Sequence, residues 1–189
     1  MKRIYFRKTT EYYLARDKNE QDRYDFLSKL TMQEVDPMPL HKFKNLQKSA
    51  VILCSPLNRV YSSLPLNANV EVENSLREVV FDLRKFCTLE EFSNKSSVIV
   101  REKFKEYFIQ DILPEKRAAL FGDIKLLLEK LQKLTATEIM IISHSFKLKL
   151  IEAYIKTNGA IESSPELIHQ YILTNEKTYR FEEGFDIEI

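Results

Sequence analysis

Glycine is scarce in this sequence: only three of the 189 residues are glycines, at positions 122, 159 and 184. Walker-type phosphate loops and dinucleotide-binding fingerprints both need several closely spaced glycines, so nucleotide binding through either motif is excluded. The chain also has no Gly/Ser-rich stretch at which a flexible linker would divide it. We therefore expect a single domain over residues 1–189.

Cysteines and long apolar runs are rare as well. Cys54 and Cys87 are the two cysteines, and neither belongs to a Cys-x-x-Cys pair, so we expect both to be reduced. No stretch approaches the roughly 20 apolar residues that span a bilayer, and the first residues lack the apolar block of an export signal. These absences predict a cytoplasmic protein without membrane contact.

Histidine is equally sparse, and the three histidines, His41, His144 and His169, are far apart in the sequence. No His-x-x-x-His or paired-cysteine spacing occurs, so the sequence predicts no metal site. We expect no other cofactor either.

Charge of one sign is not in excess, because 29 Lys and Arg residues face 28 Asp and Glu residues. This balance makes nucleic acid an unlikely main partner and requires any phosphate recognition to be local. Two short basic clusters are interleaved with aromatic residues, and we interpret both as solvated helix faces. They comprise Lys42, Lys44 and Lys48, and Arg101, Lys103 and Lys105.

Short apolar runs predict the strands. Runs of about five apolar residues between polar ones are typical of central strands covered on both faces, as in a parallel sheet. The clearest runs are residues 4–6, 50–54 and 138–142, a weaker one is 69–73, and a C-terminal edge hairpin is predicted from 178–182 and 185–189 around Gly184.

Helical patterns lie between these runs. Leucine and isoleucine recur at three- and four-residue spacing over residues 120–134, which predicts an amphipathic helix. Ser55 and Pro56 predict a helix start as cap and first helical residue, and another helix follows residues 143–145 and ends near Gly159. This alternation predicts an α/β protein, a three-layer α/β/α sandwich with a mostly parallel central sheet.

Polar side chains follow the predicted strands where each strand ends. Arg7 and Lys8 follow the first strand, Arg59 comes shortly after the second, and His144 follows the third. The carboxyl ends of parallel strands lie at one edge of a sheet, so these four residues are expected to converge there. Such a group of cations favours an anion, because arginine donors match phosphate oxygens and helix N-termini add positive charge.

These segments resemble the histidine phosphatase superfamily, whose fold is called phosphoglycerate mutase-like. The family has a strand ending in Arg-His-Gly, a Ser-Pro-Leu-x-Arg-Ala segment, a Leu-x-Glu element and a later strand ending in Ser-His-Gly. The corresponding segments here are Arg7-Lys8-Thr9, Ser55-Pro56-Leu57-Asn58-Arg59-Val60, Leu76-Arg77-Glu78 and Ser143-His144-Ser145, in the same order.

The resemblance implies a role for each matching residue. Arg7, Arg59 and His144 would bind the phosphoryl group, and His144 would stabilise it in the transition state. Glu78 would be the general acid and base. The position of the nucleophile is Lys8, so the implied catalytic positions are Lys8, Glu78 and His144. The implied reaction is phosphomonoester hydrolysis without a metal, on a small phosphorylated molecule or a phosphopeptide.

Lys8 departs from the family pattern at the nucleophile. A lysine with an ordinary pKa of about 10.4 is almost entirely ammonium at neutral pH and has no lone pair for attack. Thr9, where the family has glycine, is expected to crowd the phosphate. The sequence therefore favours a phosphate-binding pseudoenzyme, and it leaves open an active phosphatase with unconventional chemistry and a protein-interaction module with a vestigial site.

A cysteine-dependent phosphatase is a weaker alternative. Its loop needs five residues between cysteine and arginine, whereas four separate Cys54 from Arg59, and Pro56 removes a backbone donor. We interpret Cys54 as a buried strand residue. Residues 81–112 are predicted to form a helical elaboration, which in the resembled family covers the site and selects the leaving group, and most of their aromatic side chains are expected in the core.

Overall fold

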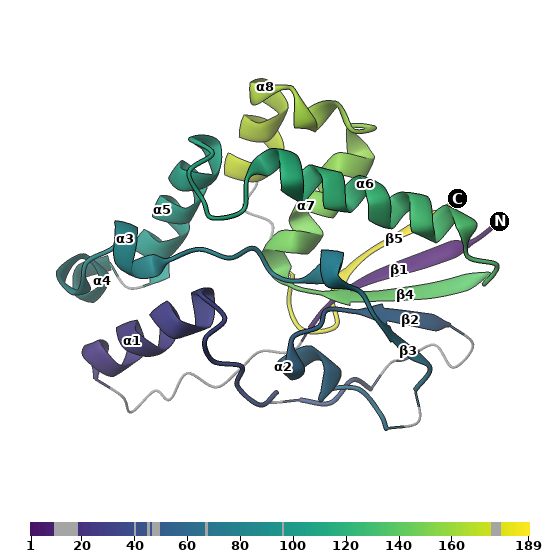
Figure 1. The fold of residues 1–189 in the computed structure, drawn as a ribbon, viewed down its shortest axis with the longest axis horizontal. Coiled ribbons are helices and arrows are strands. Elements are labelled where there is room, and N and C mark those ends of the chain that lie inside the picture. The colour runs from purple at the N-terminus through teal and green to yellow at the C-terminus, as the bar shows by residue number, and fades with distance from the viewer. Residues whose placement is uncertain are drawn as a thin grey trace. The chain divides into compact units, whose positions relative to one another are not determined.

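A computed structural model describes residues 1–9, 19–39, 41–44, 46, 50–66, 68–95, 97–174 and 179–189 (Figure 1). The chain divides into two compact units. The first unit comprises residues 1–12, 37–78 and 121–189, and the second comprises residues 13–36 and 79–120. Every residue implicated in phosphate chemistry by the sequence belongs to the first unit.

The first unit is built on a five-stranded sheet with the order β3-β2-β4-β1-β5. Four strands run parallel and β5 is antiparallel to β1, which confirms the mostly parallel sheet. The strands are β1 (Arg3–Lys8), β2 (Val51–Cys54), β3 (Val70–Val72), β4 (Glu138–Ser143) and β5 (Gly184–Glu188).

Helices cover both faces of this sheet, as Figure 1 shows, with α6 and α7 on one side and α2 on the other. This arrangement confirms the layered α/β fold. The elements are α2 (Asn58–Tyr61), η1 (Asn74–Leu76), α6 (Arg117–Lys133), α7 (Ser145–Lys156), η2 (Ala160–Glu162), α8 (Pro165–Ile168) and the π-helical η3 (His169–Leu173). The predicted stop after α7 is present, because Gly159 adopts a left-handed φ of +80°.

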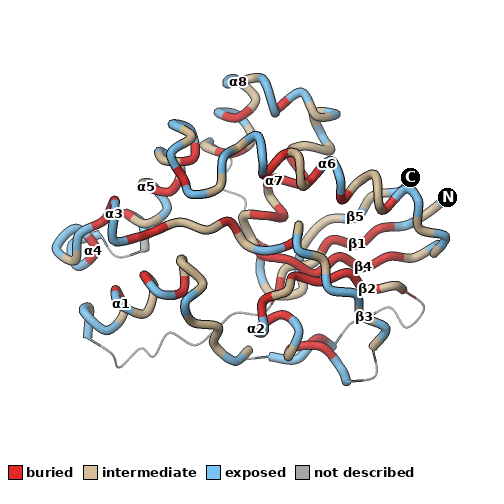
Figure 2. Tube along the Cα trace, in the orientation of Figure 1, coloured by how far each residue is buried: buried red, intermediate tan, exposed pale blue. Residues whose placement is uncertain are grey.

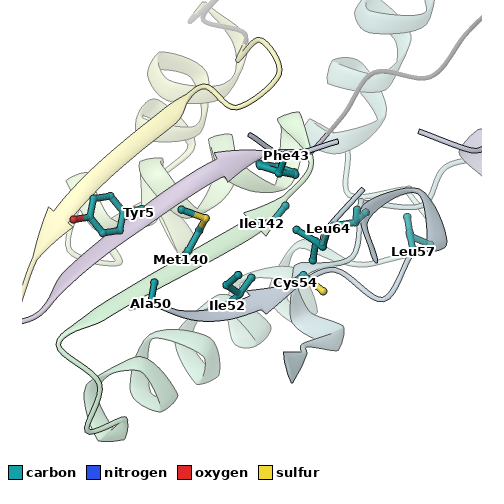
Figure 3. Close-up of a cluster of buried hydrophobic side chains, with 10 residues drawn as sticks. Tyr5, Phe43, Ala50, Ile52, Cys54, Leu57, Leu64, Met140 and Ile142 are labelled. Carbon is teal, nitrogen blue, oxygen red and sulfur yellow. The ribbon is translucent and has the colours of Figure 1, made fainter. Parts of the chain in front are cut away.

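The core lies on both faces of the sheet, and Figure 2 shows buried residues running along β1, β2 and β4. On the α2 face, Tyr5, Ile52 and Met140 pack with Phe43 and Leu64, as Figure 3 shows. Side chains alternate along a strand, so the fully buried neighbours of Tyr5, Ile4 and Phe6, serve the opposite face. This two-sided burial explains why the central strands read as continuous apolar runs.

The second unit is helical. It contains α1 (Glu20–Thr31), α3 (Leu83–Phe86), α4 (Leu89–Lys95) and α5 (Ser97–Ile109). Its core includes Tyr24 of α1 and Phe92 of α4, whose rings lie 5.7 Å apart. Three of these helices fall within residues 81–112, where aromatic side chains are largely buried, as expected. The sequence analysis missed α1, which begins after Asn19, whose side chain accepts a hydrogen bond from the Asp22 N–H.

Two local predictions were wrong. The first is the helix start at Ser55 and Pro56: α2 is a single turn with Leu57 as its N-cap. Ser55 is fully buried, and its hydroxyl accepts a long 3.4 Å hydrogen bond from the Leu57 N–H. The N-cap of α2 therefore lies two residues later than predicted. Ser55 is instead buried at the end of β2 and does not begin the helix.

The second wrong prediction is the first strand of the C-terminal hairpin, whereas its second strand is present as the edge strand β5. Residues 179–183 form no strand, and residue 178 lies outside the described residues. The Glu183 N–H instead donates to the Arg180 carbonyl at 3.0 Å, which closes a turn that leads into β5. β5 then pairs with β1, and a Cβ added at Gly184 would lie 1.6 Å from the Phe6 carbonyl oxygen, so only glycine fits there.

Candidate anion site at the carboxyl ends of the strands

The ends of β1, β2 and β4 are held together by backbone hydrogen bonds. Lys8 is the last residue of β1 and lies in register with Ser143. The Thr9 N–H donates to the Ser143 carbonyl at 2.7 Å, and the Ser55 N–H donates to the Ile142 carbonyl at 3.0 Å. The segments that carry Lys8, Ser55 and His144 therefore leave the sheet side by side, as the strand pattern predicted.

His144 is buried at this edge and fixed in orientation. It is 5% exposed and is the N-cap of α7, so its backbone is extended while its carbonyl accepts from the Leu148 N–H at 2.9 Å. Its Nε2 atom lies 2.9 Å from the Ser55 hydroxyl oxygen, within hydrogen-bond distance. Ser55 thus positions the imidazole ring, a role that the sequence analysis did not assign to it.

Three cations act on this imidazole. Burial and then the positive charges of Arg59, Lys147 and Lys8 place the pKa of His144 well below its ordinary value. The imidazole is therefore neutral at pH 7 and can donate one N–H or accept one hydrogen bond. Lys8, Arg59, His144 and Lys147 are called the basic cluster below.

The neutral His144 predicts a pH dependence of stability. Above the ordinary pKa of 6.5 both the folded and the unfolded chain hold a neutral imidazole. Below it the unfolded chain takes up a proton that the folded chain does not, so stability falls as pH falls. Between pH 7 and pH 5 we expect His144 to remove about 1–2 kcal/mol of unfolding free energy.

Urea unfolding of the wild type and of His144→Gln at both pH values checks this. The wild type should lose that much more stability than the variant. Equal losses in the two proteins would contradict a buried neutral His144.

Arg59 enters the basic cluster from α2. It is 4% exposed although it is charged, and it lies beside the fully buried Val60 in a one-turn helix. A buried guanidinium is expensive unless its donors find acceptors, so this burial points to a site that is built around charge. The sequence analysis assigned Arg59 to the site. In the structure its positive charge acts on the imidazole of His144.

Glu78 lies at the first turn of α7. Its Oε1 atom accepts a hydrogen bond from the Lys147 N–H at 3.2 Å. Two residues before Glu78, η1 is tied to β4 by the Ser143 hydroxyl, which donates to the Leu76 carbonyl at 2.7 Å. The buried Ser143 hydroxyl therefore anchors the segment that carries the carboxylate, so Glu78 and the basic cluster are brought together.

Arg7 is directed elsewhere. Its Nη1 atom lies 2.5 Å from Asp186 Oδ1 of β5 and 2.9 Å from the Phe6 carbonyl oxygen, and its guanidinium carbon lies 5.5 Å from the centre of the Tyr5 ring. β5 flanks β1 on the side away from β4. The resemblance implied that Arg7 would bind the phosphoryl group together with Arg59 and His144. The contacts described for its guanidinium are instead with Asp186, Phe6 and Tyr5.

Thr9 follows Lys8 and is 2% exposed. Its hydroxyl oxygen is buried and has no hydrogen-bond partner among the described residues. Thr9, which the resemblance aligns with a glycine, therefore has its side chain buried directly after β1.

Cys54 has none of the properties of a nucleophile. It is fully buried at the end of β2, and burial raises the pKa of its thiol to about 11. A thiol with that pKa is protonated at neutral pH, so a cysteine mechanism finds no support. Of the other two histidines, His41 lies beside the Phe181 ring, with the ring centroids 5.6 Å apart, and His169 is exposed at the start of η3.

Lys147 is the residue of the basic cluster that the sequence analysis missed. It is 2% exposed on α7, three positions after His144. The available signal was that spacing, because residues three apart on a helix share a face. A lysine in an otherwise apolar helix pattern is usually interpreted as a surface residue. The sequence analysis therefore did not assign Lys147 to the site.

Among the residues that the structure describes, no three His, Cys, Asp or Glu side chains gather closely enough to hold a metal ion. In the same part of the chain, no helix combines the length and the apolar character needed to cross a membrane.

Comparisons with known proteins identify the fold. No family model and no curated protein matches the sequence. Among solved structures, a histidine-to-alanine mutant of phosphoserine phosphatase from Entamoeba histolytica, in complex with phosphoserine, is 16% identical with a TM-score of 0.50, covering 99% of this chain and 94% of that one.

Two further structures match less well. A protein from Escherichia coli, proposed to be an alpha-ribazole-5'-P phosphatase, is 15% identical over 89% of this chain and 84% of that one, with a TM-score of 0.46. A mycobacterial hydrolase is 12% identical over 96% and 86%, with a TM-score of 0.47. The likeness to the Entamoeba structure confirms the predicted phosphoglycerate mutase-like α/β fold with a mostly parallel sheet.

Proposed function

We propose that this chain binds the phosphate group of a small phosphorylated molecule or phosphopeptide at the basic cluster, and that it hydrolyses phosphomonoesters weakly or not at all. The observation that carries the proposal is the convergence of Lys8, Arg59 and the buried His144 at one edge of the sheet. Cations held in a water-poor site favour an anion, and a phosphate dianion has three oxygens to receive their donors.

Lys8 is the reason for expecting little turnover. By the resemblance, it stands where the phosphatase family has its nucleophilic histidine, and an ammonium group cannot attack phosphorus. His144 is the histidine of the basic cluster, and its Nε2 atom is engaged with Ser55. We therefore do not assign the role of the nucleophile to His144.

Glu78 gives a second reason. A general acid must be protonated when the leaving oxygen departs. The Glu78 carboxylate instead accepts the Lys147 N–H at the N-terminal end of α7. That hydrogen bond engages Oε1 of the carboxyl group that would have to protonate the leaving oxygen. Because this contact holds the Glu78 carboxyl group against α7, we expect it to protonate a leaving group poorly.

The ligand class follows from the charge and from the similar structure. The site offers cationic donors without a recognised base-binding or sugar-binding motif, so the phosphate itself is the group recognised. The Entamoeba phosphatase with this fold was determined with phosphoserine. A phosphorylated amino acid or a phosphopeptide is therefore a suitable first ligand to test.

The proposal is tested by isothermal titration calorimetry with inorganic phosphate and by hydrolysis of p-nitrophenyl phosphate. We expect phosphate binding with negligible hydrolysis. Hydrolysis that is abolished by both Lys8→Ala and His144→Ala would replace the proposal with an active phosphatase of unconventional chemistry. A protein that shows neither phosphate binding nor hydrolysis would contradict the proposal. That result would favour a protein-interaction module with a vestigial site.

A further inference from the structure

Thr9 carries a buried hydroxyl group that the chemistry described so far does not use. The side chain is 2% exposed, and its Oγ1 atom is buried with no hydrogen-bond partner among the residues that the structure describes. A buried hydroxyl without a partner has lost its hydrogen bonds to water and gained none in return, which destabilises a fold. Most buried side-chain polar atoms are paired, so this hydroxyl calls for a physical explanation.

The backbone places Thr9 at the edge of the sheet where the strands carrying Lys8 and His144 end. Thr9 directly follows Lys8, and its N–H donates to the Ser143 carbonyl at 2.7 Å. This bond extends the parallel pairing of β1 and β4 by one step beyond the pair of Lys8 and Ser143. Thr9 therefore lies opposite His144 across the two strands.

The side chains of Thr9 and His144 belong to the same face of the sheet. Side chains alternate along a strand, and Tyr5 of β1 and Met140 of β4 both belong to the core on the α2 face. Counting in steps of two residues leads from Tyr5 to Thr9 and from Met140 to His144, whose backbone is still extended. Arg59 belongs to α2, on this side of the sheet (Figure 1). The Thr9 hydroxyl is therefore assigned to the side of the edge on which the imidazole and the guanidinium lie.

We propose that the Thr9 hydroxyl donates a hydrogen bond to the phosphate bound at the basic cluster. This inference rests on the proposed function, because it names a further binding residue for the same anion. The resembled family has glycine at this position, so its pattern supplies no such donor. The hydrogen bond gives Thr9 a favourable contact with a phosphate that the sequence analysis expected this side chain only to crowd.

A hydroxyl at this position suits an anionic oxygen. It has one donor, and an O–H group that donates to a charged oxygen makes a short and strong hydrogen bond. The branched threonine side chain has few rotamers, and the Thr9 N–H is fixed to Ser143, so the direction of the hydroxyl is restricted before phosphate binds. Because Oγ1 is buried, a phosphate oxygen that reaches it displaces the atoms that cover it, so binding includes a local rearrangement at the end of β1.

A hydroxyl completed by a buried water molecule, with no contact to a ligand, is the competing explanation. The two explanations predict opposite effects when the hydroxyl is removed. If the hydroxyl gains its partner only from phosphate, its removal raises the melting temperature of the phosphate-free protein and weakens phosphate binding. If water already completes it, its removal lowers the melting temperature and leaves phosphate affinity unchanged.

The test uses phosphate calorimetry and thermal unfolding of the full chain. Thr9→Val removes the hydroxyl at similar volume, whereas Thr9→Ser keeps it. Thr157→Val is a matched control, because the Thr157 hydroxyl donates to the Ala153 carbonyl at 2.8 Å, at the end of α7 opposite to His144. We expect phosphate to bind at least about 10-fold more weakly to Thr9→Val, the value of a hydrogen bond to a charged group. Affinity within about twofold of wild type is expected for Thr9→Ser and Thr157→Val.

A measurement on the wild type guards against a Thr9→Val variant that fails to fold. In protein labelled with ¹³C at the threonine methyl groups, phosphate should shift the methyl resonance of Thr9 and leave that of Thr157 in place. An unshifted Thr9 resonance at saturating phosphate would overturn the inference.

The outcomes separate the inference from the proposed function. A wild type that binds no phosphate refutes the proposed function. A wild type that binds phosphate, together with a folded Thr9→Val variant of unchanged affinity, refutes only the role of Thr9, whatever the melting temperature of that variant. An equal loss of affinity in Thr9→Val and Thr9→Ser also refutes it, because the loss then follows the shape of the side chain and not its hydroxyl.

Discussion

Lys8→His should hydrolyse p-nitrophenyl phosphate at least about 100-fold faster than the wild type, since a missing nucleophile costs several powers of ten in comparable enzymes. The substitution places an imidazole at the end of β1, in register with Ser143, the residue before His144. Its lone pair can attack phosphorus while Arg59 and His144 stabilise the charge on the phosphoryl oxygens.

The choice of substrate isolates the nucleophile from the acid. p-Nitrophenolate leaves as a stable anion, so its departure does not need Glu78. Phosphoserine has an alkoxide leaving group and requires protonation, so its hydrolysis should rise less in the same variant. The rates of Lys8→His and Lys8→Ala, measured with both substrates, give the comparison.

A Lys8→His variant that binds phosphate but hydrolyses neither substrate would show that the arrangement is not catalytic even with the nucleophile present. The double variant Lys8→His/His144→Ala is the control: it should lose the gained activity. If it keeps that activity, the hydrolysis arises elsewhere on the protein.

Arg59→Met should weaken phosphate binding about 100-fold, because a buried arginine donates two charge-assisted hydrogen bonds to a phosphate. Arg59→Lys keeps the charge but lacks the planar fork of donors, so an intermediate loss is expected. Calorimetric titration with inorganic phosphate measures both variants.

Arg3→Met is the matched control for a lost arginine, because Arg3 lies on β1 and its exposed side chain pairs with Glu188. Its phosphate affinity should equal that of the wild type. Thermal unfolding without phosphate establishes that each variant is folded. A folded Arg59→Met protein that binds phosphate as tightly as wild type would remove Arg59 from the site.

The sheet could be predicted from the sequence because its signal is local. Residues 4–6, 50–54 and 138–142 each carry their own apolar run, which is typical of strands covered on both faces, as in a parallel sheet. The meeting of Lys8, Arg59 and His144 followed from that topology alone. The same reasoning found the end of α7, because a glycine in the left-handed region stops a helix.

Other features depend on partners distant in the sequence, and the sequence did not reveal them. Arg7 meets Asp186, 179 positions away, only because β5 pairs with the free edge of β1. α1 was missed because its stabilising contacts are with α3 and α4 rather than within its own pattern. The burial of Lys147 likewise depends on how α7 packs, which its local sequence does not encode.

The most direct test of the account is an experimental structure of the protein crystallised with phosphate or vanadate. The account predicts a tetrahedral or trigonal anion at the carboxyl ends of β1, β2 and β4, within hydrogen-bond distance of Arg59, His144 and Lys8. An anion bound away from these residues, or an empty site at a phosphate concentration that calorimetry shows to be saturating, would contradict it.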